Sequence, residues 1–238
     1  MNLVLLREAD WIDAQSVLLR DRRAVHLREV LGASVGDVIR VGLLGGAWGQ
    51  GCVEAIAPGE VQLTVSLGDE PLPPRHRFDL VLALPRPKML RRILRTVAEF
   101  GVANLHLINS ARVEKSYWQS PLLQPEQVEA ALIAGLERSR DTILPLVHLH
   151  RRYRPFVEDQ LPELCGDRPC WITDPGASRS LADTPAVPAV VMIGPEGGFV
   201  PFEVDLAQAV VAQPVHLGSR ILSVDTALPA VLAQALPG

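Results

Sequence analysis

The sequence has no long uninterrupted apolar run, and it is poor in lysine, cysteine and aromatic residues. A membrane-spanning helix needs roughly 18 or more apolar residues in a row, and no stretch of the chain reaches that length. The apolar start over residues 3–6 meets Arg7 and Glu8 too soon to form the core of a signal peptide. We therefore expect no membrane partner and a cytoplasmic location.

Three cysteines, Cys52, Cys165 and Cys170, form neither an even disulfide framework nor a Cys-x-x-Cys pair. They are interpreted as ordinary thiols, and no metal site is expected. With 48% hydrophobic and 21% charged residues, the composition excludes general disorder and is typical of a soluble globular protein. A length of 238 residues fits one large domain or two smaller ones.

The net charge of −4 conceals a segregation along the chain. Residues 1–74 carry −4, residues 75–154 carry +7 and residues 155–238 carry −7. Genomic bias would explain why 21 of the 23 cations are arginine, but it would not explain their clustering. A concentrated positive field favours a polyanionic partner such as nucleic acid.

A proline cluster at residues 71, 73 and 74 predicts a domain boundary. We expect one domain over residues 1–72 and a second over residues 73–238. The first contains short strand-like segments around a glycine-rich turn, which is typical of a small β-barrel.

A helix expected over residues 22–31 places Arg22 and Arg23, with His26 and Arg28, on its outer surface. These side chains could meet RNA phosphates, although a solvated helix face explains them nearly as well.

After the boundary, buried strands alternate with helices, which predicts an α/β layer structure with a mainly parallel sheet. The expected strands are residues 78–84, 105–108, 146–149, 170–173 and 189–193. Helices are expected over residues 88–100 and from Pro125 and Pro201 onward.

The helix over residues 88–100 carries a stripe of Lys88, Arg91, Arg92 and Arg95 opposite its apolar face. We assign this stripe to RNA phosphates, and a solvated helix face is the alternative.

Two loops near the C-terminus carry the strongest motifs. The first reads Ile-Gly-Pro-Glu-Gly-Gly at residues 193–198 and follows a buried strand; the second reads Leu-Gly-Ser-Arg-Ile-Leu at residues 217–222. Neither the Gly-Lys-Ser/Thr ending of a phosphate loop nor a Gly-x-Gly-x-x-Gly fingerprint is present. Glycines here let the backbone approach a ligand.

Together the two loops resemble the SPOUT superfamily of S-adenosylmethionine-dependent RNA methyltransferases, and specifically the bacterial family that methylates N3 of a uridine in small-subunit (16S) ribosomal RNA. Pro87-Lys88-Met89 and the Glu-Phe-Gly-Val segment at residues 99–102 are also similar to that family. The resemblance covers the entire chain. It implies a PUA-like β-barrel domain that binds RNA, a SPOUT domain with a C-terminal trefoil knot, and a homodimer with active sites at the subunit interface.

The resemblance places the S-adenosylmethionine site in the two loops and names ribosomal RNA or the small ribosomal subunit as partner. The implied cofactor-binding residues are Ile193, Gly194, Pro195, Gly197, Leu217, Gly218, Ile221, Leu222 and Thr226.

The chemistry suggests roles for three charged residues. N3 of uracil must lose a proton before it attacks the sulfonium methyl, so a cation beside the base would stabilise the anion; Arg220 is the candidate. Glu196 and Asp225 are candidate proton acceptors; the alternatives are that Glu196 bonds loop amides and that Asp225 caps a helix. No metal is needed, because the methyl donor is itself reactive.

The sequence departs from the family pattern after the second loop. Where Arg-x-Glu-Thr-Ala is usual, this chain has Ser223, Val224, Asp225, Thr226 and Ala227, and the usual Glu-Gln pair before Pro145 is Glu137-Arg138. The lost arginine leaves open a catalytically silent RNA-binding protein. An enzyme acting on another RNA, such as transfer RNA, is a further alternative.

Overall fold

The computed structural model describes residues 2–69 and 71–236. The chain forms two compact units. The first comprises residues 1–73 together with residues 133–144, and the second comprises residues 74–132 and 145–238. The ends of the expected domains at residues 1 and 238 lie outside the described residues. Among the described residues, no helix is long and apolar enough to cross a bilayer.

The first unit is built on a five-stranded sheet in the order β1-β3-β4-β5-β2. Its strands are β1 (Val4–Leu6), β2 (Ser16–Leu19), β3 (Val38–Leu43), β4 (Trp48–Ala57) and β5 (Glu60–Leu67). Val61, Leu63 and Val65 alternate inward along β5, as expected for a half-buried strand, and join the apolar core. The expected small β-barrel is therefore confirmed as a PUA-like half-barrel.

The helical segment of the first unit corrects one expectation. It consists of α1 (Arg22–Val25) and a π-helical turn, η2 (His26–Val30). Arg23 does not lie on the outer surface: it is buried, and its guanidinium is 2.6 Å from Asp10 and 2.8 Å from Asp21. Neighbouring helical positions point about 100° apart, so Arg22 stays exposed, with its guanidinium 2.9 Å from Glu137.

The second unit is built on a six-stranded parallel sheet in the order β11-β9-β10-β6-β7-β8. Its strands are β6 (Phe78–Ala83), β7 (Asn104–Ile108), β8 (Leu146–His150), β9 (Cys170–Thr173), β10 (Ala189–Ile193) and β11 (Ala212–Val215). The five expected strands are confirmed. The expectation that residues 146–149 are buried on both faces is wrong, because β8 is an edge strand whose Leu146 is 61% exposed.

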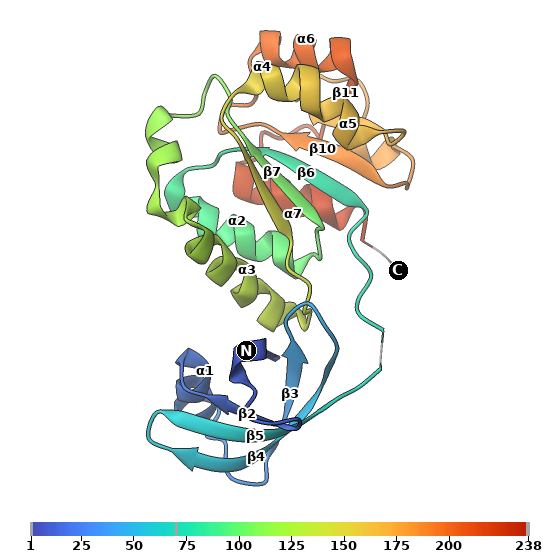
Figure 1. Cartoon of the computed structure of the whole chain (residues 1–238). Coiled ribbons are helices and arrows are strands. Elements are labelled where there is room, and N and C mark those ends of the chain that lie inside the picture. Colours follow the sequence, from blue (N-terminus) through green and yellow to red (C-terminus); the bar gives the residue numbers. More distant parts are fainter. Residues whose placement is uncertain (1, 70, 237–238) are drawn as a thin grey trace. The chain divides into compact units, whose positions relative to one another are not determined.

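Helices lie on both faces of this sheet (Figure 1). The longer helices are α2 (Pro87–Glu99), α3 (Pro125–Ser139), α6 (Pro201–Val210) and α7 (Val224–Ala233). The shorter helical segments include α4 (Tyr153–Pro155), η5 (Phe156–Gln160), α5 (Leu161–Cys165), η3 (Lys115–Gln119), η4 (Pro121–Leu123) and η6 (Leu181–Asp183). The apolar side of α2, with Leu90, Ile93, Leu94 and Val97, is buried as the spacing predicts.

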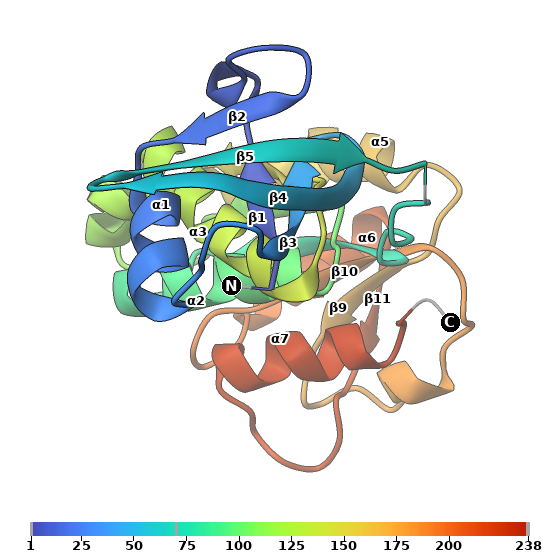
Figure 2. The ribbon, with the colours of Figure 1, turned by 90° about the horizontal axis from the view of Figure 1, so that it is seen from below.

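The end of the chain doubles back across the sheet. After β10 the chain forms α6 and then β11, which pairs with β9 at the sheet edge. It then returns through residues 216–223 to α7, which packs against β10 and α2 (Figure 2). This return brings the loop after β11 to the loop after β10.

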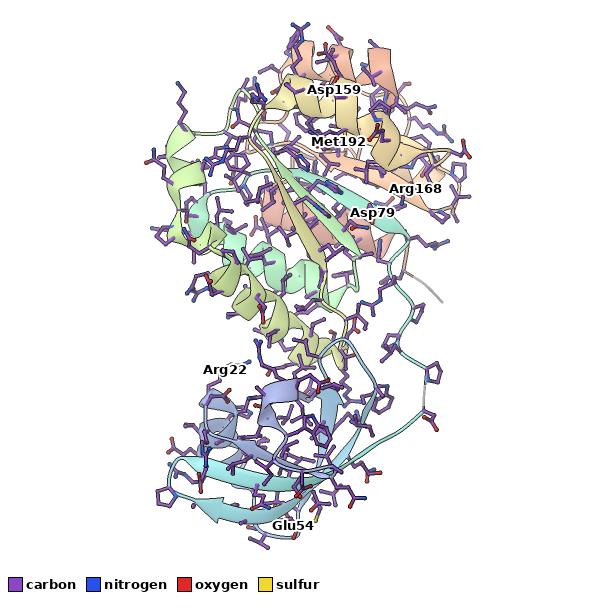
Figure 3. The ribbon with its side chains drawn as sticks, in the orientation of Figure 1. Arg22, Glu54, Asp79, Asp159, Arg168 and Met192 are labelled. Atoms are coloured by element: carbon purple, nitrogen blue, oxygen red, sulfur yellow. The ribbon has the colours of Figure 1, made fainter. Side chains whose placement is uncertain are left out.

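A polar row, in which Asp79 and His106 are buried, crosses one face of the parallel sheet. Asp79 of β6 accepts hydrogen bonds from Arg168 at 2.6 Å and from Asn104 at 3.0 Å (Figure 3). Beside them His106 of β7 stacks on His148 and contacts His150, with 3.0 Å between the ring nitrogens of His106 and His150. Burial, together with the neighbouring histidines, lowers the pKa of His106 to about 4. His106 is therefore a neutral part of the core near neutral pH.

This histidine predicts acid sensitivity. In the unfolded chain His106 has a pKa of about 6.5 and is protonated below that pH. In the folded chain it stays neutral until about pH 4. Stability is therefore lost as pH falls from about 6.5 toward 4, by up to about 3 kcal/mol. In urea unfolding measured across this range, His106→Leu should flatten the pH dependence. An unchanged slope would show that another group causes it.

Candidate active site

A cavity of about 360 Å³ opens at the carboxyl ends of β9, β10 and β11 in the second unit. Three segments form most of its wall: residues 173–175 at the end of β9, residues 193–199 at the end of β10, and residues 217–222 after β11. Residues 196 and 219 of these segments do not line the cavity. Val204, Val224 and Ala227 complete it from α6 and α7. In open parallel sheets, ligands bind at this edge.

The cavity brings together most of the residues singled out by the motifs. The lining residues among them are Ile193, Gly194, Pro195, Gly197, Leu217, Gly218, Arg220, Ile221 and Leu222. Three others lie outside the lining: Thr226 faces Ser223 at 3.0 Å between hydroxyls, Glu196 is 3.9 Å from Arg86, and Asp225 is 3.6 Å from Arg92. The two loops therefore share one cavity, while both candidate carboxylates sit beside arginines.

Glycines are required in the first loop for two different reasons. A Cβ on Gly194 would lie 2.8 Å from the backbone nitrogen of Phe199, so the loop closes on itself too tightly for any side chain there. Gly197 has φ +91°, which other residues rarely adopt. The loop thus presents backbone to the cavity in a conformation that the sequence motif makes possible.

The charged part of the cavity wall is small. Among the described residues that line it, the charged ones are Arg220 and Asp174. Asp174 follows β9, and its Oδ1 accepts a hydrogen bond from the Gly176 backbone at 3.0 Å. Asp174 is not among the site residues expected from the sequence, although its position directly after a buried parallel strand could have indicated it.

Two side chains outside the motifs fix the first loop. Arg112, after β7, donates to the carbonyl oxygens of Gly197 and Gly198. Glu203, buried in the first turn of α6, accepts hydrogen bonds from the Ser110 hydroxyl at 3.0 Å, the Ala111 backbone at 2.8 Å and the Val200 backbone at 3.0 Å. These bonds join the loop after β7 to the loop after β10.

The departure at residue 223 is accommodated locally. Ser223 is the N-cap residue of α7, where its hydroxyl makes no cap bond to the backbone and lies 3.0 Å from the hydroxyl of Thr226 instead. Arg92, which belongs to the α2 stripe, approaches Asp225 of the same segment at 3.6 Å. Lys88, Arg91 and Arg92 are exposed, whereas Arg95 is half-buried.

Comparison with known proteins identifies the family. Residues 72–236 match the model of an RNA methyltransferase domain. The ribosomal RNA small subunit methyltransferase E of Treponema pallidum is 31% identical, over 99% of this chain and 91% of that protein. The protein of the same name from Synechocystis is 32% identical, over 92% of this chain and 72% of that protein. The chain belongs to this RNA methyltransferase family.

Solved structures agree with the fold of this methyltransferase. The Neisseria gonorrhoeae ribosomal RNA small subunit methyltransferase E, solved with S-adenosylmethionine, superposes with a TM-score of 0.78 at 21% identity and covers 98% of this chain and 95% of that one. A Legionella pneumophila methyltransferase structure, also holding S-adenosylmethionine, gives 0.75 at 20% identity with the same coverage. The expected SPOUT-type α/β fold, preceded by a PUA-like half-barrel, is confirmed.

The Glu203 bonds generate a stability prediction. Glu203→Ala leaves buried donors without their charged acceptor, which should lower the free energy of unfolding by about 3 kcal/mol. The exposed Asp205 lies on the same helix, so Asp205→Ala is the matched control and should change stability by less than about 0.5 kcal/mol. Thermal unfolding measures both. Equal effects would show that the Glu203 bonds do not fix the loop.

Proposed function

We propose that this methyltransferase transfers the methyl group of S-adenosylmethionine to N3 of a uridine in small-subunit (16S) ribosomal RNA. One observation carries the proposal: two separate motif loops and the end of β9 enclose a single cavity with one arginine in its wall. The names of the relatives support ribosomal RNA over transfer RNA as the substrate.

The cavity suits S-adenosylmethionine in its chemistry. Apolar side chains such as Ile193, Leu217 and Leu222 offer contacts for an adenine ring, and the glycine backbone offers hydrogen bonds to its edge. Asp174 provides a carboxylate for a hydroxyl or ammonium group. When bound, this cofactor supplies an electrophilic methyl group on a sulfonium.

Arg220 is proposed to act on the target base. It is exposed in the wall of the cavity, so its guanidinium is accessible to a base entering from solvent. A uracil oxygen gains negative charge as N3 loses its proton, and a fixed guanidinium there stabilises that charge. Holding the base in line with the methyl group would supply much of the remaining rate enhancement.

Glu196 and Asp225 remain the proposed proton acceptors. Glu196 lies on the loop after β10, and Asp225 lies in the first turn of α7. Both are within 4.0 Å of an arginine side chain, Arg86 and Arg92 respectively. Each carboxylate is thus held beside the cavity, without lining it. Thr226 is kept as a proposed cofactor-binding residue because its neighbours Val224 and Ala227 on α7 line the cavity.

RNA phosphates are proposed to contact exposed cations of both units. In the first unit Arg22 is proposed to contact a phosphate, whereas the buried Arg23 is not. In the second it keeps the stripe on α2, where Lys88, Arg91 and Arg92 are exposed, and gives the half-buried Arg95 the smallest part.

A cytoplasmic homodimer is proposed as the working form. Ile221, in the cavity wall, is 89% exposed. An apolar side chain so exposed at a functional cavity favours cover by a second copy or by substrate. Sedimentation of the free protein tests the dimer.

The function itself is tested by deletion of the gene in its host. Mass spectrometry of small-subunit ribosomal RNA should then show the loss of one N3-methyluridine, and the purified protein with S-adenosylmethionine should restore it. Cofactor binding without any methylation would favour a silent RNA-binding protein instead.

Loop geometry predicts the effect of a valine at residue 197. Gly197→Val must adopt an unfavourable positive φ in the wall of the cavity, so S-adenosylmethionine affinity should fall by about two orders of magnitude or more. Gly59 also has a positive φ, +84°, and lies in open space at a position distant in the sequence from the cavity loops. Gly59→Val is therefore the control for backbone strain alone. Its affinity for S-adenosylmethionine should be unchanged in calorimetric titration. Unchanged affinity in Gly197→Val would remove the cofactor assignment.

Arg220 should be the most sensitive single side chain for turnover. Arg220→Ala should reduce single-turnover methylation by about 10²–10³, because a preorganised donor to the developing anion is lost. Arg220→Lys should also be impaired, since lysine lacks the planar fork. The Arg220→Ala defect should shrink at higher pH, where more of the uracil is already deprotonated.

Arg179 provides the control for Arg220. It is exposed and lies on the loop after β9, outside the cavity wall, so Arg179→Ala should retain the parent rate. An Arg220→Ala protein that stays dimeric, binds cofactor and RNA, and reacts within about threefold of the parent would refute the catalytic role and favour an interface role.

A further inference from the structure

The loops after β7 and β8 carry five exposed cations at the same edge of the parallel sheet as the cavity. We propose that these residues, named here the basic ridge, bind the single-stranded RNA that flanks the target uridine. The basic ridge consists of Arg112, Lys115, Arg151, Arg152 and Arg154. The inference rests on the proposed function and adds a docking surface to it, separate from the α2 stripe.

The two loops of the basic ridge are bonded into one surface. β7 and β8 are neighbouring parallel strands, so their carboxyl ends lie side by side. The Asn109 backbone donates to the His150 carbonyl at 2.9 Å, and the Trp118 indole donates to the Asn109 side chain at 2.9 Å. Figure 1 shows the green segment after β7 next to the yellow segment that leads into α4.

Two arginines of the basic ridge are stacked on aromatic rings. The Arg151 guanidinium carbon lies 5.3 Å from the centre of the buried Trp118 ring, and that of Arg154 lies 5.6 Å from the centre of the Phe202 ring. Phe202 is 55% exposed. Guanidinium planes and exposed aromatic rings are surfaces on which unpaired RNA bases stack. The basic ridge therefore offers stacking as well as charge.

The basic ridge leads directly to the cavity. Arg112 bonds the carbonyl of Gly197, which lines the cavity, and Phe202 lies on α6 between the lining residues Phe199 and Val204. The Tyr153 hydroxyl also donates to the Glu203 carbonyl at 2.7 Å, which joins the loop after β8 to α6. RNA lying on the ridge would thus pass the cavity wall where a flipped base must enter.

The charge of the surface favours RNA over a second copy of the chain. Three exposed carboxylates lie on the same segments, Glu114, Glu158 and Asp159, and Glu158 pairs with Arg154 at 3.0 Å, so the five cations leave an excess of two positive charges. The remaining excess of positive charge would repel the same surface on a symmetric partner, since a two-fold interface brings like patches together. Phosphates instead gain from it.

Binding of a fluorescent oligouridine of about twelve nucleotides, a length within the site size of single-strand binders, tests the ridge by anisotropy. The Arg151→Ala/Arg152→Ala double variant should bind at least about tenfold more weakly at moderate salt, with the salt slope reduced by about one. Phe202→Ala should weaken binding about fivefold or more without changing the slope. Arg151→Lys, which keeps the charge, should weaken binding with an unchanged slope.

Arg179 is the matched control, because it also stacks on a tryptophan, at 5.5 Å from the Trp171 ring centre, but belongs to a different loop. Arg179→Ala should bind oligouridine within about twofold of the parent, and S-adenosylmethionine titration should show parent affinity for every ridge variant. Equal weakening by Arg179→Ala, or an unchanged salt slope in the double variant, would overturn the proposal. So would a changed oligomeric state of the double variant in sedimentation, which would make the ridge a protein interface.

The proposed function fails separately from the ridge. If the parent protein binds oligouridine through the ridge but methylates no ribosomal RNA, the reaction is wrong and the surface stands. If the parent methylates ribosomal RNA and the ridge variants methylate and bind RNA as the parent does, the surface is wrong and the reaction stands.

Discussion

The parallel direction of the second sheet is the constraint on which the site depends. Because all six strands run the same way, the loops that follow them emerge at one edge. The cavity uses three of those loops, after β9, β10 and β11, and the basic ridge uses the two after β7 and β8. An antiparallel strand at any of these places would send its loop to the opposite edge and remove one wall.

Buried polar groups then set how rigid that edge is. Glu203 accepts hydrogen bonds from the loop after β7 and from the start of its own helix, while Asp79 holds Arg168 and Asn104 within the sheet. A buried charge is tolerated only where hydrogen bonds replace water. These two carboxylates thus tie particular backbone segments together, whereas the surrounding apolar contacts fix only the layers. The tight first loop, with Gly194 against Phe199, depends on that fixed background.

Periodicity and motif spacing predicted five of the six strands of the second sheet, the helices α2, α3 and α6, and the two loops of the cavity, because each of these follows from local sequence. The burial of a side chain that depends on residues distant in the sequence could not be predicted in this way. Arg23 looked like a surface cation, because its neighbours in the helix give no sign that it forms an ion pair with Asp10, which is distant in the sequence. Residues 146–149 looked like a doubly buried strand, since an apolar run does not reveal a position at the sheet edge. Arg112 and Asp174 were missed because single residues after strands carry no motif.

Arg112 connects the two proposed binding surfaces. Its guanidinium donates to the carbonyls of the glycines that shape the cavity, and its chain segment belongs to the basic ridge. A phosphate that reached the same guanidinium would compete with those carbonyl oxygens or bind the remaining N–H groups, since arginine has five donors. In either case the conformation of the first loop and the occupancy of the ridge are not independent. Linkage then requires that the factor by which the cofactor changes RNA affinity equals the factor by which RNA changes cofactor affinity.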